Sequence, residues 1–192
     1  MVLCASNPAA GDLMDLEMTL GEGPAVDACR GNAAHEADLL SASVLRWETY
    51  GPEAVALGAR AVFGYPIQLG AVRFGALSLF RSSPGPLTTE QSSDGYLMAS
   101  VLGRAILNTQ AGGSHQSLVG ELDGSSMLDF RVHQAAGMVA VQGSMSVKDA
   151  LVILRAHAFA IGCRLGVLAD RVVSLTTRYE PETSEWINEE ES

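Results

Sequence analysis

The stretch that decides the fold of the second half of this chain is RVHQAAGMVAVQGSMSVKDALVILRAHAFAIGCRLGVLADRVVSL, residues 131–175. Its apolar residues return every three or four positions, which is the spacing of an amphipathic helix. Glycines at 143 and 162 interrupt the pattern at the points where two helices should end. The sequence therefore predicts three helices joined by short turns, over about 127–142, 147–161 and 165–175.

The middle helix of the three carries the most informative surface. Ser146 is placed to cap its first turn, with Asp149 at the third position as in a capping box. Its predicted inward stripe consists of Val147, Ala150, Leu151, Leu154, Ala158 and Ile161. The predicted inward residues of the next helix are Leu165, Leu168, Ala169, Val172 and Val173.

Burying that stripe leaves a mixed basic and aromatic set on the opposite side of the middle helix. The set, called the outer face below, consists of Lys148, Val152, Arg155 and Phe159. Two bases interleaved with an exposed aromatic on one helix face can contact a phosphate chain and stack an unpaired base. The alternative is that Phe159 packs on a neighbouring helix and the bases are merely solvated. His157 is expected to be a packing histidine.

Charge is distributed unevenly along the chain. The whole sequence has a net charge of −10, but residues 131–178 hold six bases against two acids, a local charge of +4. A local basic excess is what a polyanion-binding module requires, although +4 is modest. Residues 179–192 hold six glutamates and no base. We expect residues 181–192 to form an acidic tail, disordered except around Trp186 and Ile187, which is solvated or competes with RNA.

The first half, residues 1–110, is predicted to be mixed α/β. A short strand is expected over 2–6, and Pro24, after the turn Gly21-Glu22-Gly23, is placed to open a helix through about Arg30. Alternating apolar residues predict a β-hairpin of strands 61–69 and 72–80, in which Pro66 indicates an edge or a bulge. The other predicted segments are helices over 53–58 and from Thr89 or Ser92 to 108, then a linker over 109–117.

The second half resembles an ANTAR domain, a three-helix RNA-binding module of bacterial transcription antiterminators. The matching segments are Val132–Gln142, Ser146-x-x-x-Ala150-Leu151-x-x-Leu154-Arg155-Ala156-His157-Ala158-Phe159 and Leu165-x-x-Leu168-Ala169-x-x-Val172-Val173. This resemblance covers about 50 residues and places the ANTAR domain at 118–180. The RNA-binding residues expected on it are Arg155, Lys148, Phe159, Arg164, Arg131 and His133.

The first half resembles the GAF domain that often precedes ANTAR in actinobacterial proteins. The matching residues are Gly21-Glu22-Gly23-Pro24-x-x-Asp27-Ala28, Trp47, and the hairpin from Ala61 to Phe80. Many relatives have a cysteine where this chain has Ala25, and the GAF part lacks the usual first helix and strand before residue 2. The resulting expectation is an α+β protein with a GAF-like (PAS-like) antiparallel sheet and flanking helices, followed by an all-α ANTAR domain.

The two resemblances together imply a sensor and an effector for RNA. A GAF-like sensor at 1–110 would bind an unknown small molecule or mediate dimerisation, and the ANTAR domain would bind RNA stem-loops in leader transcripts. Signal transduction to transcription antitermination would then need no chemistry, only tighter binding of one RNA fold than of its rival. An uncovered sheet edge, which tends to recruit a second chain, leads us to expect a homodimer.

Two other classes of function stay open: a DNA-binding helix-turn-helix regulator, and a ligand-binding or dimerisation protein without an RNA function. Neither an enzyme nor a cofactor is expected, because no catalytic set is suggested by spacing. No metal site is expected either. The four histidines, at 35, 115, 133 and 157, form no ligand pair, and the three cysteines are far apart. The chain shows neither a long apolar run nor a signal-peptide pattern, so a cytoplasmic location without a membrane partner is expected.

Overall fold

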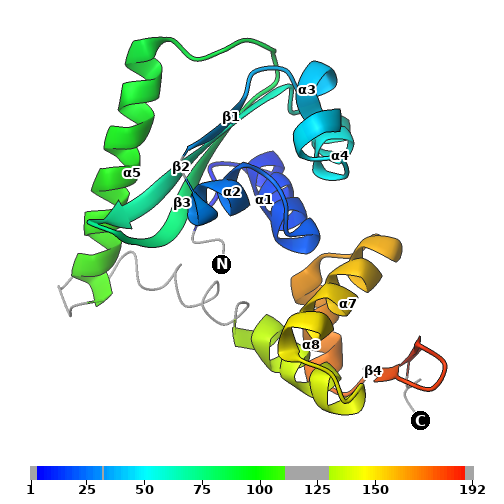
Figure 1. Cartoon of the computed structure of the whole chain (residues 1–192). Helices are drawn as coiled ribbons and strands as arrows, with labels where there is room; N and C mark the ends of the chain where they lie inside the picture. Colours follow the sequence, from blue (N-terminus) through cyan, green and yellow to red (C-terminus); the bar gives the residue numbers. More distant parts are fainter. Residues whose placement is uncertain (1–3, 32, 111–129, 189–192) are drawn as a thin grey trace. The chain divides into compact units, whose positions relative to one another are not determined.

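The computed structural model describes residues 4–31, 33–110 and 130–188 (Figure 1). The fold is α+β, with helices around a small antiparallel sheet. The chain divides into two units, an N-terminal unit within Cys4–Val119 and a C-terminal unit within Gly120–Ser192. No single described helix is long and apolar enough to cross a bilayer, and the one helix pair that qualifies by length and composition is bent by 107°.

The sheet of the N-terminal unit has the strand order β1-β2-β3, all antiparallel. Its strands are β1 (Ala34–Glu36), β2 (Ala61–Leu69) and β3 (Val72–Arg81). The β2–β3 hairpin is confirmed, but β2 is the central strand rather than an edge. Pro66 is tolerated because β1 pairs only with residues 62–64 of β2, and because a bulge follows between Ile67 and Gln68.

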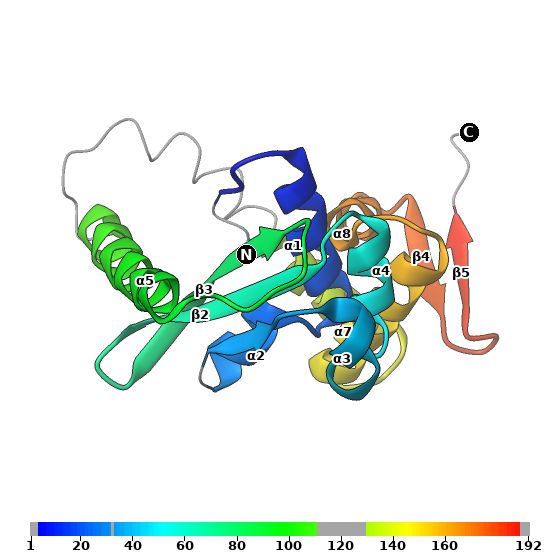
Figure 2. The ribbon, with the colours of Figure 1, turned by 90° about the horizontal axis from the view of Figure 1, so that it is seen from above.

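Helices cover both faces of the sheet, as Figures 1 and 2 show. They are α1 (Pro8–Leu20), α2 (Pro24–Arg30), α3 (Leu39–Arg46), α4 (Tyr50–Ala56) and α5 (Thr89–Gln110). The odd-numbered residues of β2 from Ala61 to Ile67 form a core cluster with Ala99 of α5. Val62, on the other face, packs in a second cluster with Leu13 of α1 and Trp47. Residues 61–67 are therefore all buried, whereas the sequence predicted less buried neighbours in alternate positions.

Glycines allow two helices to approach β2 very closely. A Cβ built on Gly64 would overlap the backbone carbonyl of Pro24 at the start of α2. On the other face, a Cβ on Gly95 of α5 would overlap the ring of Tyr65. Each glycine thus fixes the distance between a helix and the central strand, because no larger residue fits.

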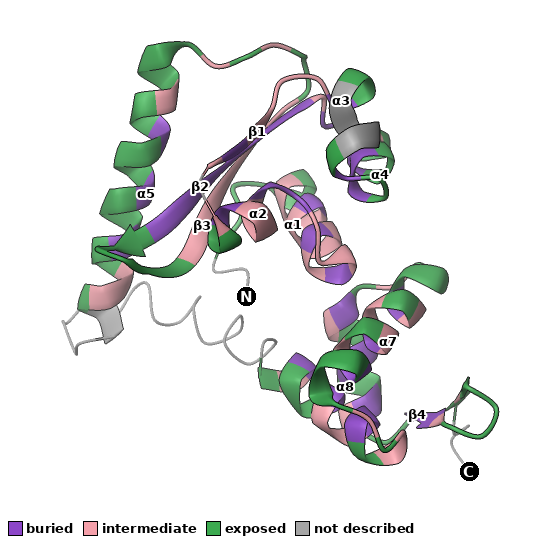
Figure 3. Cartoon of the chain, in the orientation of Figure 1, coloured by how far each residue is buried: buried purple, intermediate pink, exposed green. Residues whose placement is uncertain are grey.

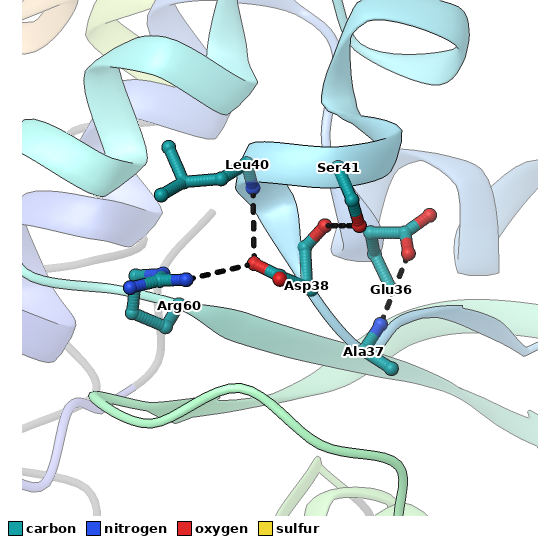
Figure 4. A network of polar contacts seen from close by, with 6 residues as sticks. All are labelled: Glu36, Ala37, Asp38, Leu40, Ser41 and Arg60. Carbon is teal, nitrogen blue, oxygen red and sulfur yellow. Dashed lines mark hydrogen bonds and ion pairs between the residues drawn. The ribbon is translucent and has the colours of Figure 1, made fainter.

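The start of α3 is held by a small polar network (Figure 4). Asp38 caps the helix, accepting the backbone N–H of Leu40 at 3.2 Å. The same carboxylate oxygen lies 3.1 Å from Nη2 of Arg60, and Ser41 Oγ donates to the carbonyl of Asp38. The network anchors α3 to the residue that precedes β2.

Three expectations for the first half are wrong in detail, and two elements were missed. The helix expected over 53–58 is α4, which begins three residues earlier and ends at Ala56. No strand forms over Cys4–Ser6, because Asn7 caps α1, which begins at Pro8; residues 2 and 3 lie outside the described part. The sequence did not predict β1 or α3, which are short and lack a clear apolar period. The helix expected to end at 108 continues to Gln110, so the predicted linker begins inside α5, and residues 111–117 lie outside the described residues.

The described part of the C-terminal unit contains three helices in the predicted order. They are Phe130–Gln142, α7 (Val147–Ala160) and α8 (Leu165–Val173); residues 127–129 of the first predicted helix are outside the described part. Ser146 caps α7 as predicted: its Oγ accepts the N–H of Asp149 at 3.1 Å and lies 2.6 Å from Asp149 Oδ2. The third helix ends two residues earlier than predicted, at Val173.

The core of this unit follows the predicted helical stripes, with two exceptions. Ala150, Leu154 and Ala158 of α7 are buried together with Leu165, Leu168, Ala169 and Val172 of α8. Val147 and Ile161, at the two ends of the predicted stripe, are exposed instead. Val147 is the first residue of α7 and Ile161 follows its last turn, so neither lies over the neighbouring helices.

The predicted all-α character of the C-terminal unit is wrong, and the order expected around Trp186 and Ile187 takes the form of a strand. Strands β4 (Thr177–Glu180) and β5 (Glu185–Asn188) form an antiparallel hairpin, visible in Figure 2. The Trp186 ring stacks on His157 of α7, with centroids 4.5 Å apart and planes 12° apart, and it also contacts Tyr179. One aromatic side chain thus joins the tail to the helical core, which composition alone did not reveal; residues 189–192 are not described.

Candidate functional site

The outer face of α7 is exposed in the structure. Val152 is 62% exposed and Phe159 is 42% exposed, while Lys148 is also exposed and Arg155 is half-buried. Phe159 is therefore partly exposed to solvent and does not belong to the buried core of the unit. At 1.5 Å per residue, the four side chains extend over about 16 Å along one side of the helix.

Phe159 and Val152 are apolar residues whose exposure the core does not explain. Three buried residues on the opposite side of α7, Ala150, Leu154 and Ala158, already pack against the other helices. An exposed aromatic ring on the same helix face as two cationic side chains is an arrangement that binds nucleobases by stacking and phosphates by charge. The surface can do this without any rearrangement of the core.

The remaining predicted RNA-binding residues lie on other elements. Arg131 Nη1 is 3.5 Å from Asp170 Oδ1, so Arg131 joins the Phe130–Gln142 helix to α8. Arg164 is the exposed N-cap residue of α8, and His133 is exposed on the first helix. Only Lys148, Arg155 and Phe159 of the predicted set are thus brought together on one helix face.

The acidic hairpin lies away from the outer face. His157, on which Trp186 stacks, is two residues from both Arg155 and Phe159, about 160° to 200° around the helix from each. Burial lowers the pKa of His157 below its ordinary value, which agrees with its expected packing role. Residues 177–188 are therefore bound to another side of α7, and the outer face stays uncovered by them.

A buried carboxyl in the N-terminal unit was missed by the sequence analysis. Glu17 of α1 is only 2% exposed, and its Oε2 accepts the backbone N–H of Ala25 at 2.6 Å. Burial raises its pKa to about 8, although the hydrogen bonds from Ala25 and Val26 oppose this. The signal was available, since Glu17 falls among Leu13, Leu16 and Leu20 in the apolar stripe of α1.

The Gly21–Pro24 turn is built around carboxylates. Gly23, with φ +130°, leaves room for Glu17, whose side-chain atoms would lie 2.6–3.0 Å from a Cβ at that position. Glu22 Oε1 accepts the backbone N–H groups of Thr49 and Tyr50, which ties the turn to the start of α4. The turn thus has a structural role, and the side chains of Glu17 and Glu22 occupy the space around it.

The Tyr50 and Tyr65 hydroxyls and His35 Nε2 are buried, and none of them has a hydrogen-bond partner among the described residues. Burial, and next the nearby Glu17, raise the pKa of Tyr50 far above its ordinary value. A shallow depression of about 190 Å³ lies elsewhere, lined by Pro66, Gln68, Gly70, Tyr96 and Ser100. It is smaller than a usual small-molecule site of roughly 300–1,000 Å³. The ligand expected for this unit stays unassigned.

No group of three or more His, Cys, Asp or Glu side chains in the described parts of the chain is placed to hold a metal ion. Family models, curated proteins and solved structures show no match to this chain. The resemblance to GAF and ANTAR domains therefore stays a prediction from the residues.

Proposed function

We propose that the protein is a non-enzymatic RNA-binding regulator of transcription antitermination, in which the outer face of α7 contacts stem-loop RNA. The observation that carries this proposal is the exposure of Phe159, one turn beyond Arg155 on a face that also carries Lys148, on a helix whose opposite side is packed. Exposed loop bases of RNA stack on such rings, and the flanking phosphates form ion pairs with Lys148 and Arg155.

The proposal assigns separate roles to the two units. The C-terminal unit, an ANTAR-like module, binds the RNA. The N-terminal unit, a GAF-like module, provides dimerisation or senses a small molecule, and the whole acts in the cytoplasm. A single base at the end of the nine-residue α8 makes this helix a poor reader of a DNA major groove, which disfavours the helix-turn-helix alternative.

The experiment compares binding of the full chain to a two-hairpin RNA with exposed loops and to duplex DNA of equal length, at about 150 mM salt. Lys148→Ala and Arg155→Ala should weaken RNA binding and each reduce the salt dependence by about one phosphate contact. Phe159→Ala should weaken it by about tenfold while leaving the salt dependence unchanged, since base stacking contributes about 1–3 kcal/mol.

Arg178→Ala is the matched control. Arg178 is an exposed base on β4, 3.7 Å from Glu180, in the hairpin that packs away from the outer face. Its removal changes the net charge by the same amount as Arg155→Ala, so non-specific electrostatics should respond equally to both. Equal weak binding to RNA and DNA, or equal losses in Arg178→Ala and Arg155→Ala, would refute the proposal.

A further inference from the structure

Helix α5 packs against the sheet with one face only. Gly95, Ala99 and Gly103 are buried toward β2, and Ile106 packs in the same cluster. Figure 3 shows the buried positions of α5 on the side of the strands and exposed positions on the opposite side. The 22 residues of α5 are about 33 Å long, so the solvent-facing side is an extended surface.

The centre of this solvent-facing side is apolar. Leu97 is 64% exposed and Val101 is 57% exposed, one helical turn apart, and Met98 beside them is also exposed. Polar side chains flank the pair: Asp94 precedes it by one turn and Arg104 follows it by one turn, on the same side of the helix. A contiguous apolar strip with charged ends is typical of a protein contact surface.

The order of these four side chains is self-complementary. Two copies of α5 can meet antiparallel on their exposed faces, with the twofold axis at the level of Ala99 along the helix. Residues equidistant in sequence from position 99 then face each other. Leu97 then faces Val101 of the second copy, and Asp94 faces Arg104 of the second copy. Each of these contacts occurs twice, as a twofold interface requires. A parallel pairing would instead place Asp94 opposite Asp94 and Arg104 opposite Arg104, where like charges repel.

We propose that this face of α5 binds the same face of a second copy of the chain, with the two helices antiparallel about Ala99. Neither Asp94 nor Arg104 makes an ion pair within the described residues, so both are available to the second copy. The strip offers a few apolar side chains per chain, which is small for a permanent dimer, and the dimer should dissociate on dilution. The inference does not depend on RNA binding.

Sedimentation velocity of the full chain over a wide range of concentrations, without RNA, tests the interface. The wild-type chain should dimerise reversibly, and Leu97→Asp should abolish the dimer because two unpaired carboxylates would be placed at its apolar centre. Leu57→Asp is the control, since Leu57 is an exposed leucine at the end of α4, outside the strip. A wild-type chain that stays monomeric throughout, or a dimer that Leu97→Asp leaves intact, overturns the proposal.

Charge reversal tests the antiparallel orientation. Asp94→Arg and Arg104→Asp should each raise the dissociation constant about tenfold, because each places like charges together at both ends of the strip. The double variant D94R/R104D should restore the wild-type value, since opposite charges face each other again. Circular dichroism of each variant checks that the substitution leaves the helical content of the folded chain unchanged. A double variant as weak as the single ones overturns the antiparallel arrangement.

Discussion

Glu17→Gln removes the one buried carboxyl whose titration the structure ties to the folding of the N-terminal unit. The pKa of Glu17 is 4.5 as a free side chain and about 8 in the folded chain, because burial disfavours its charge. The folded state therefore holds a proton that the unfolded state has released between these two values. It follows that the free energy of unfolding falls as pH rises from 4.5 to about 8. Above about pH 8, Glu17 causes no further change in this free energy.

The magnitude follows from the size of the shift. At about 1.4 kcal/mol per pKa unit, Glu17 costs the folded state about 5 kcal/mol at pH 9 relative to pH 4. Glutamine has the same shape, keeps an oxygen for the N–H of Ala25, and does not titrate. The free energy of unfolding of Glu17→Gln should match that of the wild type near pH 5. At pH 9 it should exceed the wild-type value by up to about 5 kcal/mol.

Urea unfolding between pH 5 and 9 measures the effect. The chain has two tryptophans, and Trp47 is buried in the N-terminal unit. In a Trp186→Phe background, the fluorescence therefore reports on that unit alone. Glu48→Gln, at an exposed position of the same unit, controls for the loss of one negative charge. Wild-type and Glu17→Gln stabilities that change in parallel with pH would refute the reasoning.

Four further substitutions test the packing and the helix capping. Trp186→Ala should destabilise the C-terminal unit by about 1–3 kcal/mol and raise the pKa of His157 toward 6.5, measurable by thermal unfolding and NMR titration; an unchanged histidine titration would contradict the stacking. Gly64→Ala should cost about 3 kcal/mol or more in urea unfolding, because its Cβ would overlap the Pro24 carbonyl, whereas Gly11→Ala on α1 has room and should stabilise by about 1 kcal/mol. Ser146→Ala should cost about 1 kcal/mol through loss of the α7 cap, and no cost would contradict the capping geometry.

Helical periodicity and capping predicted the C-terminal helices well because these signals are local. Ser146 and Gly162 mark the limits of α7, and the residues that the period places inward are buried along most of its length. The β4–β5 hairpin could not be predicted in this way. Its strands have four residues each, and the Trp186 contact with His157 joins positions 29 residues apart, which no local pattern reveals.

In the N-terminal unit too, local sequence predicted the elements that neighbouring residues determine, but not those that depend on distant contacts. Pro24 and the Ala61–Phe80 alternation predicted α2 and the hairpin, since their causes lie within a few residues. Strand β1 exists only because β2 is beside it, and Glu17 is buried only because the turn at Gly23 closes over it. For the outer face, the sequence predicted which residues share one side of α7, but only the structure shows that Phe159 is exposed.

The two glycine contacts across the sheet have a mechanical consequence. Gly64 places the backbone of α2 directly on β2, and the next residue, Tyr65, reaches the backbone of α5 at Gly95 on the opposite face. The backbones of both helices are thus in direct contact with β2, one through Gly64 and the other through the ring of Tyr65. Because closely packed backbone and a rigid ring deform little, a displacement of the Gly21–Pro24 turn is transmitted to α5 near Gly95.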